Sequence, residues 1–194
     1  EVMKTLHFDA RFIRTDHHDG ISRFSVELIN ELSRKADLVA IICDKKQLDF
    51  LPKGISFVEV NKPESPKEFF IARTLNKLGV SHVCSPMQVM GSFGRKYKLV
   101  LTLHDLIYYR HRTPPQDLSL FLRLVWRLYH LTYWPQRLLL NRADAIVTVS
   151  ETTKKLIAKH KLTRKPVAVV YNAAAMAKVA EARTEPRGKK LVYI

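Results

Sequence analysis

Two polar loops carry the residue types that could bind an anion or move a proton. The first runs from Arg14 to Phe24 and contains Asp16-His17-His18-Asp19 followed directly by Gly20. A glycine at the entrance of a helix lets backbone N–H groups approach an anion closely, and the helix N-terminus favours negative charge. Residues 14–24 are therefore a candidate phosphate site.

The second polar loop begins after Leu103 and contains His104, Asp105, Arg110 and Arg112. A histidine at the end of a strand can hydrogen-bond a substrate hydroxyl or carry a proton near neutral pH. It can equally cap its own loop by bonding to the backbone. The residues alone leave both roles open.

Other kinds of site are disfavoured by the same residues. His17 and His18 with two aspartates could bind a metal ion, but adjacent side chains rarely converge, so we do not expect a metal site. The pattern G-x-G-x-x-G is missing, which disfavours a hydride-transferring dehydrogenase. Cys43 and Cys84 lie in apolar segments and are expected to be reduced core residues.

Strands that alternate with helices must position these loops. We expect strands at 4–9, 37–43, 55–60, 81–85, 99–103, 145–149 and 167–171, and helices at 21–32, 66–78, 117–141 (interrupted at Pro135) and 151–160. This alternation predicts an α/β fold, a Rossmann-like parallel sheet with helices on both faces. Ligands bind such sheets at the carboxyl ends of the strands, where both polar loops begin.

The domain boundaries follow from composition. We expect residues 3–172 to form one domain and residues 173–189, rich in Ala, Lys, Arg and Glu, to be a linker. The apolar residues 190–194 are expected to be the first strand of a second domain that the sequence does not continue into.

The net charge of +15 is concentrated in residues 69–194, which hold 22 Lys/Arg against 6 Asp/Glu. Such a field attracts nucleic acid, anionic lipid or phosphorylated small molecules. No apolar run approaches the roughly 20 residues that span a bilayer. With no secretory signal either, we expect a cytoplasmic protein and consider a peripheral position on the inner face of the cell membrane.

One predicted helix has a form that suits a membrane surface. Over residues 117–134, Ser119, Arg123, Arg127 and His130 share one strip, and the opposite side is apolar. This pattern is typical of a helix lying on a membrane, and equally of a core helix packed on the sheet. In the first case the candidate headgroup contacts are Arg110, Arg112, Arg123 and Arg127.

Five segments, in the expected order over nearly the whole chain, resemble glycosyltransferase family 4, whose members are retaining enzymes of the GT-B fold. They are Phe8-Asp9-Ala10-Arg11, Asp19-Gly20-Ile21-Ser22-Arg23-Phe24 with Glu27-Leu28, Leu103-His104-Asp105-Leu106, Ala143-Asp144-Ala145-Ile146-Val147-Thr148-Val149-Ser150-Glu151 and Val169-Val170-Tyr171-Asn172-Ala173. The resemblance implies that this is the N-terminal domain of such an enzyme.

The resemblance also implies roles for single residues. His104 would approach the transferred sugar, with Asp105 beside it, and these two are the catalytic candidates. The candidate donor-binding residues are Gly20, Ile21, Ser150, Glu151 and Asn172, the last at the exit toward the second domain. Members often carry two glycines in the first loop, whereas this chain has Gly20 alone.

The implied reaction is transfer of a sugar from a nucleotide sugar to a glycan or lipid-linked acceptor with retention of configuration. The protein would stabilise the departing diphosphate and the oxocarbenium-like sugar without a covalent bond. GDP-mannose, which many relatives use, is the expected donor. The sequence has no Asp-x-Asp, which agrees with transfer that needs no metal or other cofactor. Because the second domain binds most of the donor in such enzymes, a chain ending at Ile194 is expected to be inactive alone.

Two alternatives remain. The charge would suit a nucleic-acid-binding α/β domain, but the aromatic residues lie in apolar stretches and no helix-turn-helix, zinc or RNA-recognition signature is present, so we expect no nucleic-acid partner. A nucleotide-sugar epimerase built on the same two-domain plan would share the sequence features described.

Overall fold

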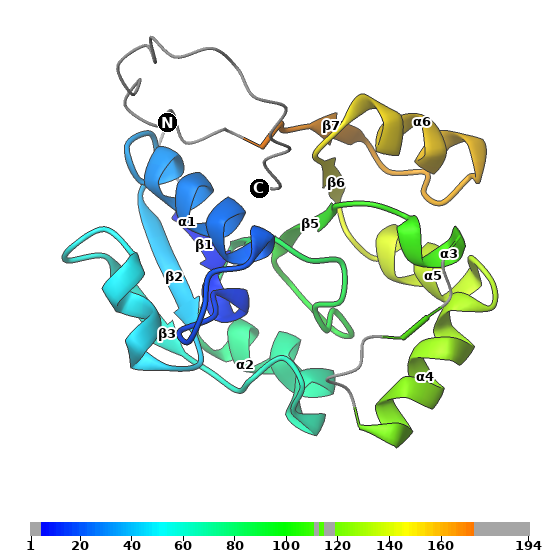
Figure 1. Ribbon diagram of the computed structural model, residues 1–194. Helices are drawn as coiled ribbons and strands as arrows, with labels where there is room; N and C mark the ends of the chain where they lie inside the picture. Colours follow the sequence, from blue (N-terminus) through cyan, green and yellow to red (C-terminus); the bar gives the residue numbers. More distant parts are fainter. Residues whose placement is uncertain (1–4, 111–112, 115–118, 173–194) are drawn as a thin grey trace, which may run out of the picture.

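The computed structural model describes residues 5–110, 113–114 and 119–172. Their centre is a seven-stranded sheet in the order β3-β2-β1-β4-β5-β6-β7, in which every neighbouring pair is parallel (Figure 1). The strands are β1 (Leu6–Asp9), β2 (Leu38–Ile42), β3 (Ser56–Glu59), β4 (His82–Ser85), β5 (Lys98–Leu103), β6 (Ala145–Thr148) and β7 (Val167–Val169). The predicted parallel sheet is therefore confirmed.

In the described part of the chain, six α-helices and three short 3-10 helices connect the strands. They are η1 (Ala10–Phe12), α1 (Gly20–Ser33), η2 (Lys45–Phe50), η3 (Pro66–Phe70), α2 (Ile71–Lys77), α3 (Ile107–Arg110), α4 (Leu120–His130), α5 (Trp134–Asn141) and α6 (Glu151–Lys159). Within the described residues, no helix is long and apolar enough to cross a bilayer.

Helices cover both faces of the sheet, as predicted. Along β2, Ala40 belongs to a core that contains Ile29 of α1, whereas its neighbour Ile41 belongs to a second core that contains Ile71 of α2 and Leu140 of α5. Successive side chains of a strand point to opposite faces, so the two cores lie on opposite sides of the sheet.

Three predicted elements differ in detail. The segment 55–60 was expected as a strand like the others, and the structure places β3 at the edge of the sheet with Phe57 exposed. The helix expected at 66–78 starts as η3 before it becomes α2. The helix expected at 117–141 is two helices, and Pro135 lies in the first turn of α5, where its missing N–H would have no helical partner. The predicted linker and the strand at 190–194 lie outside the described residues.

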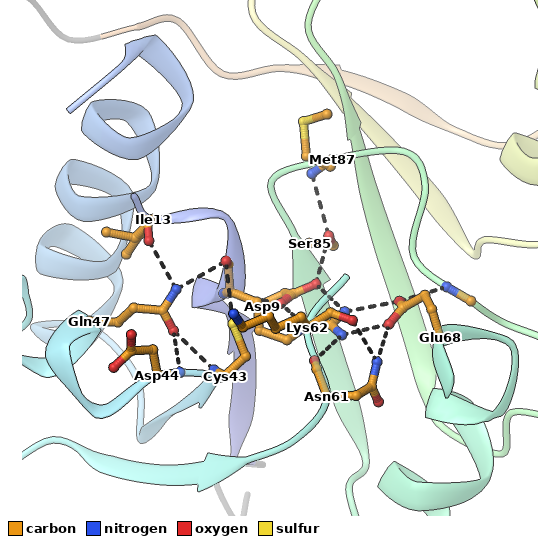
Figure 2. Close-up of polar contacts among 12 residues, drawn as sticks. Asp9, Ile13, Cys43, Asp44, Gln47, Asn61, Lys62, Glu68, Ser85 and Met87 are labelled. Atoms are coloured by element: carbon orange, nitrogen blue, oxygen red, sulfur yellow. Dashed lines mark hydrogen bonds and ion pairs between the residues drawn. The ribbon is translucent and has the colours of Figure 1, made fainter. Parts of the chain in front are cut away.

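A buried ionic network joins the carboxyl ends of the neighbouring central strands β1 and β4 (Figure 2). The strand order reverses between these two: β2 and β3 follow on the side of β1, whereas β5, β6 and β7 follow on the side of β4. Arg11 donates to Asp9 at 2.7 and 3.0 Å and to Glu68 at 2.6 and 3.0 Å. The Ser85 hydroxyl donates to Asp9 at 3.2 Å, and the Gly91 amide donates to Glu68 at 3.2 Å. Ligands often bind at such a reversal of strand order, but here protein side chains fill it.

Charge pairing holds this network together. Asp9 is completely buried and Arg11 is 4% exposed. Burial by itself lowers the pKa of Arg11, but the carboxylates of Asp9 and Glu68 hold that pKa above its usual range. The arginine is therefore charged inside the domain and fixes the start of the loop that leads to α1.

Candidate functional site

The described residues enclose a cleft of about 640 Å³ between α1 and the segment that follows β7. Val170, Tyr171 and Asn172, which directly follow β7, line this cleft together with residues of α1. Both polar and apolar side chains line the cleft: His18, Gly20, Arg23, Phe24, Val26, Glu27, Leu28, Glu31, Val170, Tyr171 and Asn172. Gly20 and Asn172, two of the predicted donor-binding residues, are thus brought together although 152 positions separate them.

The N-terminus of α1 opens into this cleft. Asp19 caps the helix by accepting from the Ser22 amide at 2.8 Å, and the Arg23 amide bonds back to the Asp19 carbonyl at 3.0 Å. The amides that precede them, those of Gly20 and Ile21, belong to the first turn, where helical N–H groups have no partner within the helix. They are the donors that a bound anion can use.

Gly20 has a second property that suits close contact with a ligand. A Cβ built on Gly20 would meet no atom of the described chain within 4 Å, and its φ is not positive. Neither packing nor backbone conformation therefore requires glycine here. Gly20 is exposed and the space beside it is open, so a ligand can approach the backbone at the start of α1 closely.

His104 directly follows β5, and its ring is fixed by two contacts. The Nε2 atom lies 2.8 Å from the carbonyl oxygen of Pro86, so Nε2 carries a proton and donates it. The imidazole ring also makes an edge-to-face contact with the ring of Phe24, with 5.0 Å between the two ring centroids. Burial lowers the pKa of His104, against smaller opposing effects of the Pro86 bond and of Asp105. The neutral ring then presents Nδ1 as a hydrogen-bond acceptor.

These contacts connect the loops at three strand ends. Phe24 lies one turn after Gly20 and lines the same cleft. The Thr153 hydroxyl of α6 donates to the His104 carbonyl at 3.3 Å and lies 3.0 Å from the Ser150 hydroxyl. The structure therefore brings the region of Gly20, His104 and Ser150 together at the carboxyl edge of the sheet. His104 does bond a backbone carbonyl, but that of Pro86 in the loop after β4 and not one of its own loop, as the alternative had it.

Three further predicted site residues lie at helix ends. Asp105 is exposed and accepts from the Ile107 amide at 3.0 Å, so it caps α3. Ser150 caps α6 by accepting from the Thr153 amide at 3.1 Å. Glu151 is exposed in the first turn of α6, where a carboxylate interacts favourably with the helix dipole. Each of these residues has a structural role beside any contact with substrate.

Of the predicted acceptor or membrane arginines, Arg123 and Arg127 are not among the residues that line the cleft. Arg127 is exposed on α4, and Arg123 is half-buried on the same helix. Arg110 ends α3, and Arg112 lies outside the described residues. The two histidines weighed as metal ligands diverge: His17 contacts Asp16 at 2.9 Å, whereas His18 packs on the ring of Phe50. Among the described residues, no group of three or more His, Cys, Asp or Glu could hold a metal ion.

Two features of the site were missed in the sequence. Phe24 was named only at the end of the first polar loop and in a segment that resembles the family, yet it connects the cleft with His104. Glu68, whose carboxylate is the second one paired with Arg11, was given no role in the sequence analysis. The Asp9-x-Arg11 pair at the end of an apolar strand was a signal for a buried ion pair, but nothing in the spacing pointed to Glu68 57 positions later.

Comparison with known families identifies the chain. The sequence profile described as Glycosyltransferase Family 4 matches residues 18–177, which is well over half of the sequence. The comparison with curated proteins finds no match. The seven-stranded parallel sheet agrees with the Rossmann-like domain of a GT-B glycosyltransferase. With a cleft at the carboxyl edge and the family profile spanning the residues that build it, the chain belongs to glycosyltransferase family 4.

Proposed function

We propose that the protein transfers a sugar from a nucleotide-sugar donor to a glycan or lipid-linked acceptor with retention of configuration. The observation that carries this proposal is the open N-terminus of α1 beside an oriented, neutral imidazole in one region of the carboxyl edge. Family membership supports a glycosyltransferase. GDP-mannose is the first donor to test, which would make the enzyme a mannosyltransferase.

The α1 end of the cleft is suited to the donor's diphosphate. The amides of Gly20 and Ile21 would donate to its oxygens, and the helix dipole would favour its charge. Arg23 adds a cation to the same lining, while Arg14 lies 3.3 Å from Asp19 and offsets the charge of that carboxylate. Donors fixed before reaction stabilise the charge that develops as the diphosphate leaves.

His104 would position the sugar. Because the Nε2–H group of His104 donates to the Pro86 carbonyl, Nδ1 is the ring atom that can accept a hydrogen bond from a sugar hydroxyl. Asp105 would support this placement by fixing the first turn of α3 next to His104. Asn172 offers an amide in the same cleft, and Ser150 with Glu151 would set the α6 side of the site.

A second domain, joined through the residues after Asn172, would close the cleft and bind the nucleotide. We further propose that the acceptor is lipid-linked and that the enzyme works as a peripheral protein on an anionic membrane. Transfer needs no metal in this scheme, because amides and cations of the protein neutralise the diphosphate.

The test uses the full-length protein with labelled nucleotide sugars and lipid or glycan acceptors, and with EDTA in a parallel reaction. Gly20→Ala and Gly20→Val are expected to unfold at the wild-type temperature, since a Cβ meets no protein atom. The rate of sugar transfer should fall from wild type to Ala to Val, because a larger side chain keeps the diphosphate away from the amides at the start of α1. The anomeric configuration of the product is read by NMR.

Specific results would contradict the proposal. Full activity of Gly20→Val would contradict the proposed role of α1 in binding the diphosphate. A product with inverted anomeric configuration would contradict the proposed retention. Conversion of the nucleotide sugar to its epimer without acceptor would identify an epimerase instead. Loss of transfer in EDTA that added metal restores would contradict metal independence.

A further inference from the structure

Helix α4 exposes its apolar side to solvent. Its most exposed side chains include Leu120, Phe121, Leu124 and Leu128, and Leu120 is 83% exposed. At 100° per residue, the exposed apolar residues of α4 and the adjoining Leu131 span an arc of about 200° on the helix surface. None of the α4 residues is buried.

The opposite side of α4 faces the protein through aromatic and polar groups. Trp126 and His130 pack on Tyr108 at centroid distances of 5.2 and 5.9 Å, and His130 also contacts Tyr109. The helix is therefore inverted relative to a normal surface helix, whose apolar stripe faces the core. The sequence pattern allowed a core helix packed on the sheet, and the structure excludes that arrangement for α4.

An exposed apolar face of this extent points to a covering partner. Monomeric proteins in water rarely expose contiguous apolar patches above a few hundred Å². With 11 residues, α4 is about 16 Å long, so it is too short to cross a hydrocarbon core of about 30 Å. It has the dimensions of a helix that lies in the plane of an interface.

The charges around this face favour an anionic partner. Arg127 borders the apolar arc, and no Asp or Glu occurs from 118 to 143. On α5, Trp134 lines an open hollow of about 380 Å³ together with Arg137 and Arg142. A second copy of the chain is a poor occupant, because a self-complementary contact through α4 would bring like-charged arginines together.

We infer that α4 lies flat in the headgroup region of an anionic phospholipid membrane, with Leu124, Leu128 and Phe121 immersed and Arg127 at the phosphates. Apolar burial and attraction to anionic lipids together provide the binding. This inference rests on the proposed function for its role in transfer, since it would bring the cleft to a lipid-linked acceptor. Binding to vesicles itself is measured without donor or acceptor.

The experiment compares wild type with Leu124→Glu/Leu128→Glu in flotation with phosphatidylcholine vesicles, with and without phosphatidylglycerol. The control is Phe57→Glu/Leu78→Glu, which adds the same charge at two exposed apolar residues of β3 and the end of α2. Leu78 is 52% exposed, close to the 55% and 57% of Leu124 and Leu128.

The expected result is binding of wild type and control to the anionic vesicles only, with at least about a tenfold loss for the α4 variant. Tryptophan fluorescence gives a second readout in wild type, because the emission of Trp126 and of Trp134, which is 66% exposed, should shift to the blue when anionic vesicles are added. This readout does not depend on the folding of any variant.

Three outcomes overturn the inference: equal binding of the α4 variant and the control, no fluorescence shift in wild type, or a wild-type dimer that the α4 substitutions dissociate. Transfer to a soluble acceptor is assayed separately in the full-length protein. Transfer without vesicle binding would refute the membrane contact alone, whereas vesicle binding without transfer would refute the proposed function alone.

Discussion

Replacing Arg11 with methionine is expected to lower the free energy of unfolding by about 3–5 kcal/mol, the range for breaking a buried ion pair. The guanidinium of Arg11 donates to both carboxyl oxygens of Asp9 and of Glu68. Methionine pairs with neither. Of the hydrogen bonds to Asp9 within the described residues, those from the Ser85 hydroxyl and the backbone amide of residue 11 would remain, in a site with no exposed surface.

Urea unfolding followed by circular dichroism measures this loss. With a slope of about 2 kcal/mol per molar urea, the midpoint should fall by about 2 M. The control is Arg34→Met, which removes a salt bridge to Glu31 whose side chains are 71% and 59% exposed, and should cost less than about 1 kcal/mol.

A double-mutant cycle tests the reasoning directly. Glu68→Gln should cost less than Arg11→Met, because Glu68 also accepts from the Gly91 amide and from Asn61. The double variant should lose less than the sum of the two, with a coupling of about 0.5–3 kcal/mol. Additive losses, or a midpoint for Arg11→Met equal to that of Arg34→Met, would refute the assignment of this network as a buried, coupled unit.

Three further predictions can be tested by thermal unfolding. Gly91→Ala should destabilise the domain and shorten its soluble lifetime, because a Cβ there would collide with the backbone carbonyl of Glu68; an unchanged melting temperature would contradict this. Ser150→Ala removes the cap of α6 and should cost about 1 kcal/mol, or roughly 2–4 °C. Partial burial raises the pKa of Asp144, but the hydrogen bond from the Leu99 amide and nearby cations hold it below its usual range. The stability that this carboxylate contributes is fully present above the pKa of an ordinary aspartate and is lost as the pH falls through the lowered pKa of Asp144. Asp144→Asn should therefore flatten the acid limb of a plot of melting temperature against pH.

Most of the sheet could be predicted because each strand is a short apolar run between turn or helix signals. Residues 37–43 are an example: their continuous apolar pattern is that of a strand covered on both faces, and β2 lies between β1 and β3 with cores on either side. The edge position of β3 was not predictable from its residues, because it depends on the order in which strands pair.

The candidate site was predictable in composition but not in contacts. Gly20 and His104 could be identified because both follow predicted strands. The partner of His104 could not, since Pro86 lies at the end of β4, and only the pairing of β4 with β5 brings the two together. Proline at position 135 signalled a helix boundary, but the residue type does not tell whether a helix ends or begins there.

The position of β1 has a consequence for how the domain folds. Of the described strands, β1 is synthesised first, yet it pairs with β2 on one side and β4 on the other, and its Asp9 meets Ser85 76 positions later. Until that later segment emerges from the ribosome, the charged groups at positions 9 and 11 have no complete set of partners. Contacts so distant in sequence close slowly. The N-terminal segment is therefore expected to gain hydrogen-exchange protection late in refolding, after local helices such as α6 have formed.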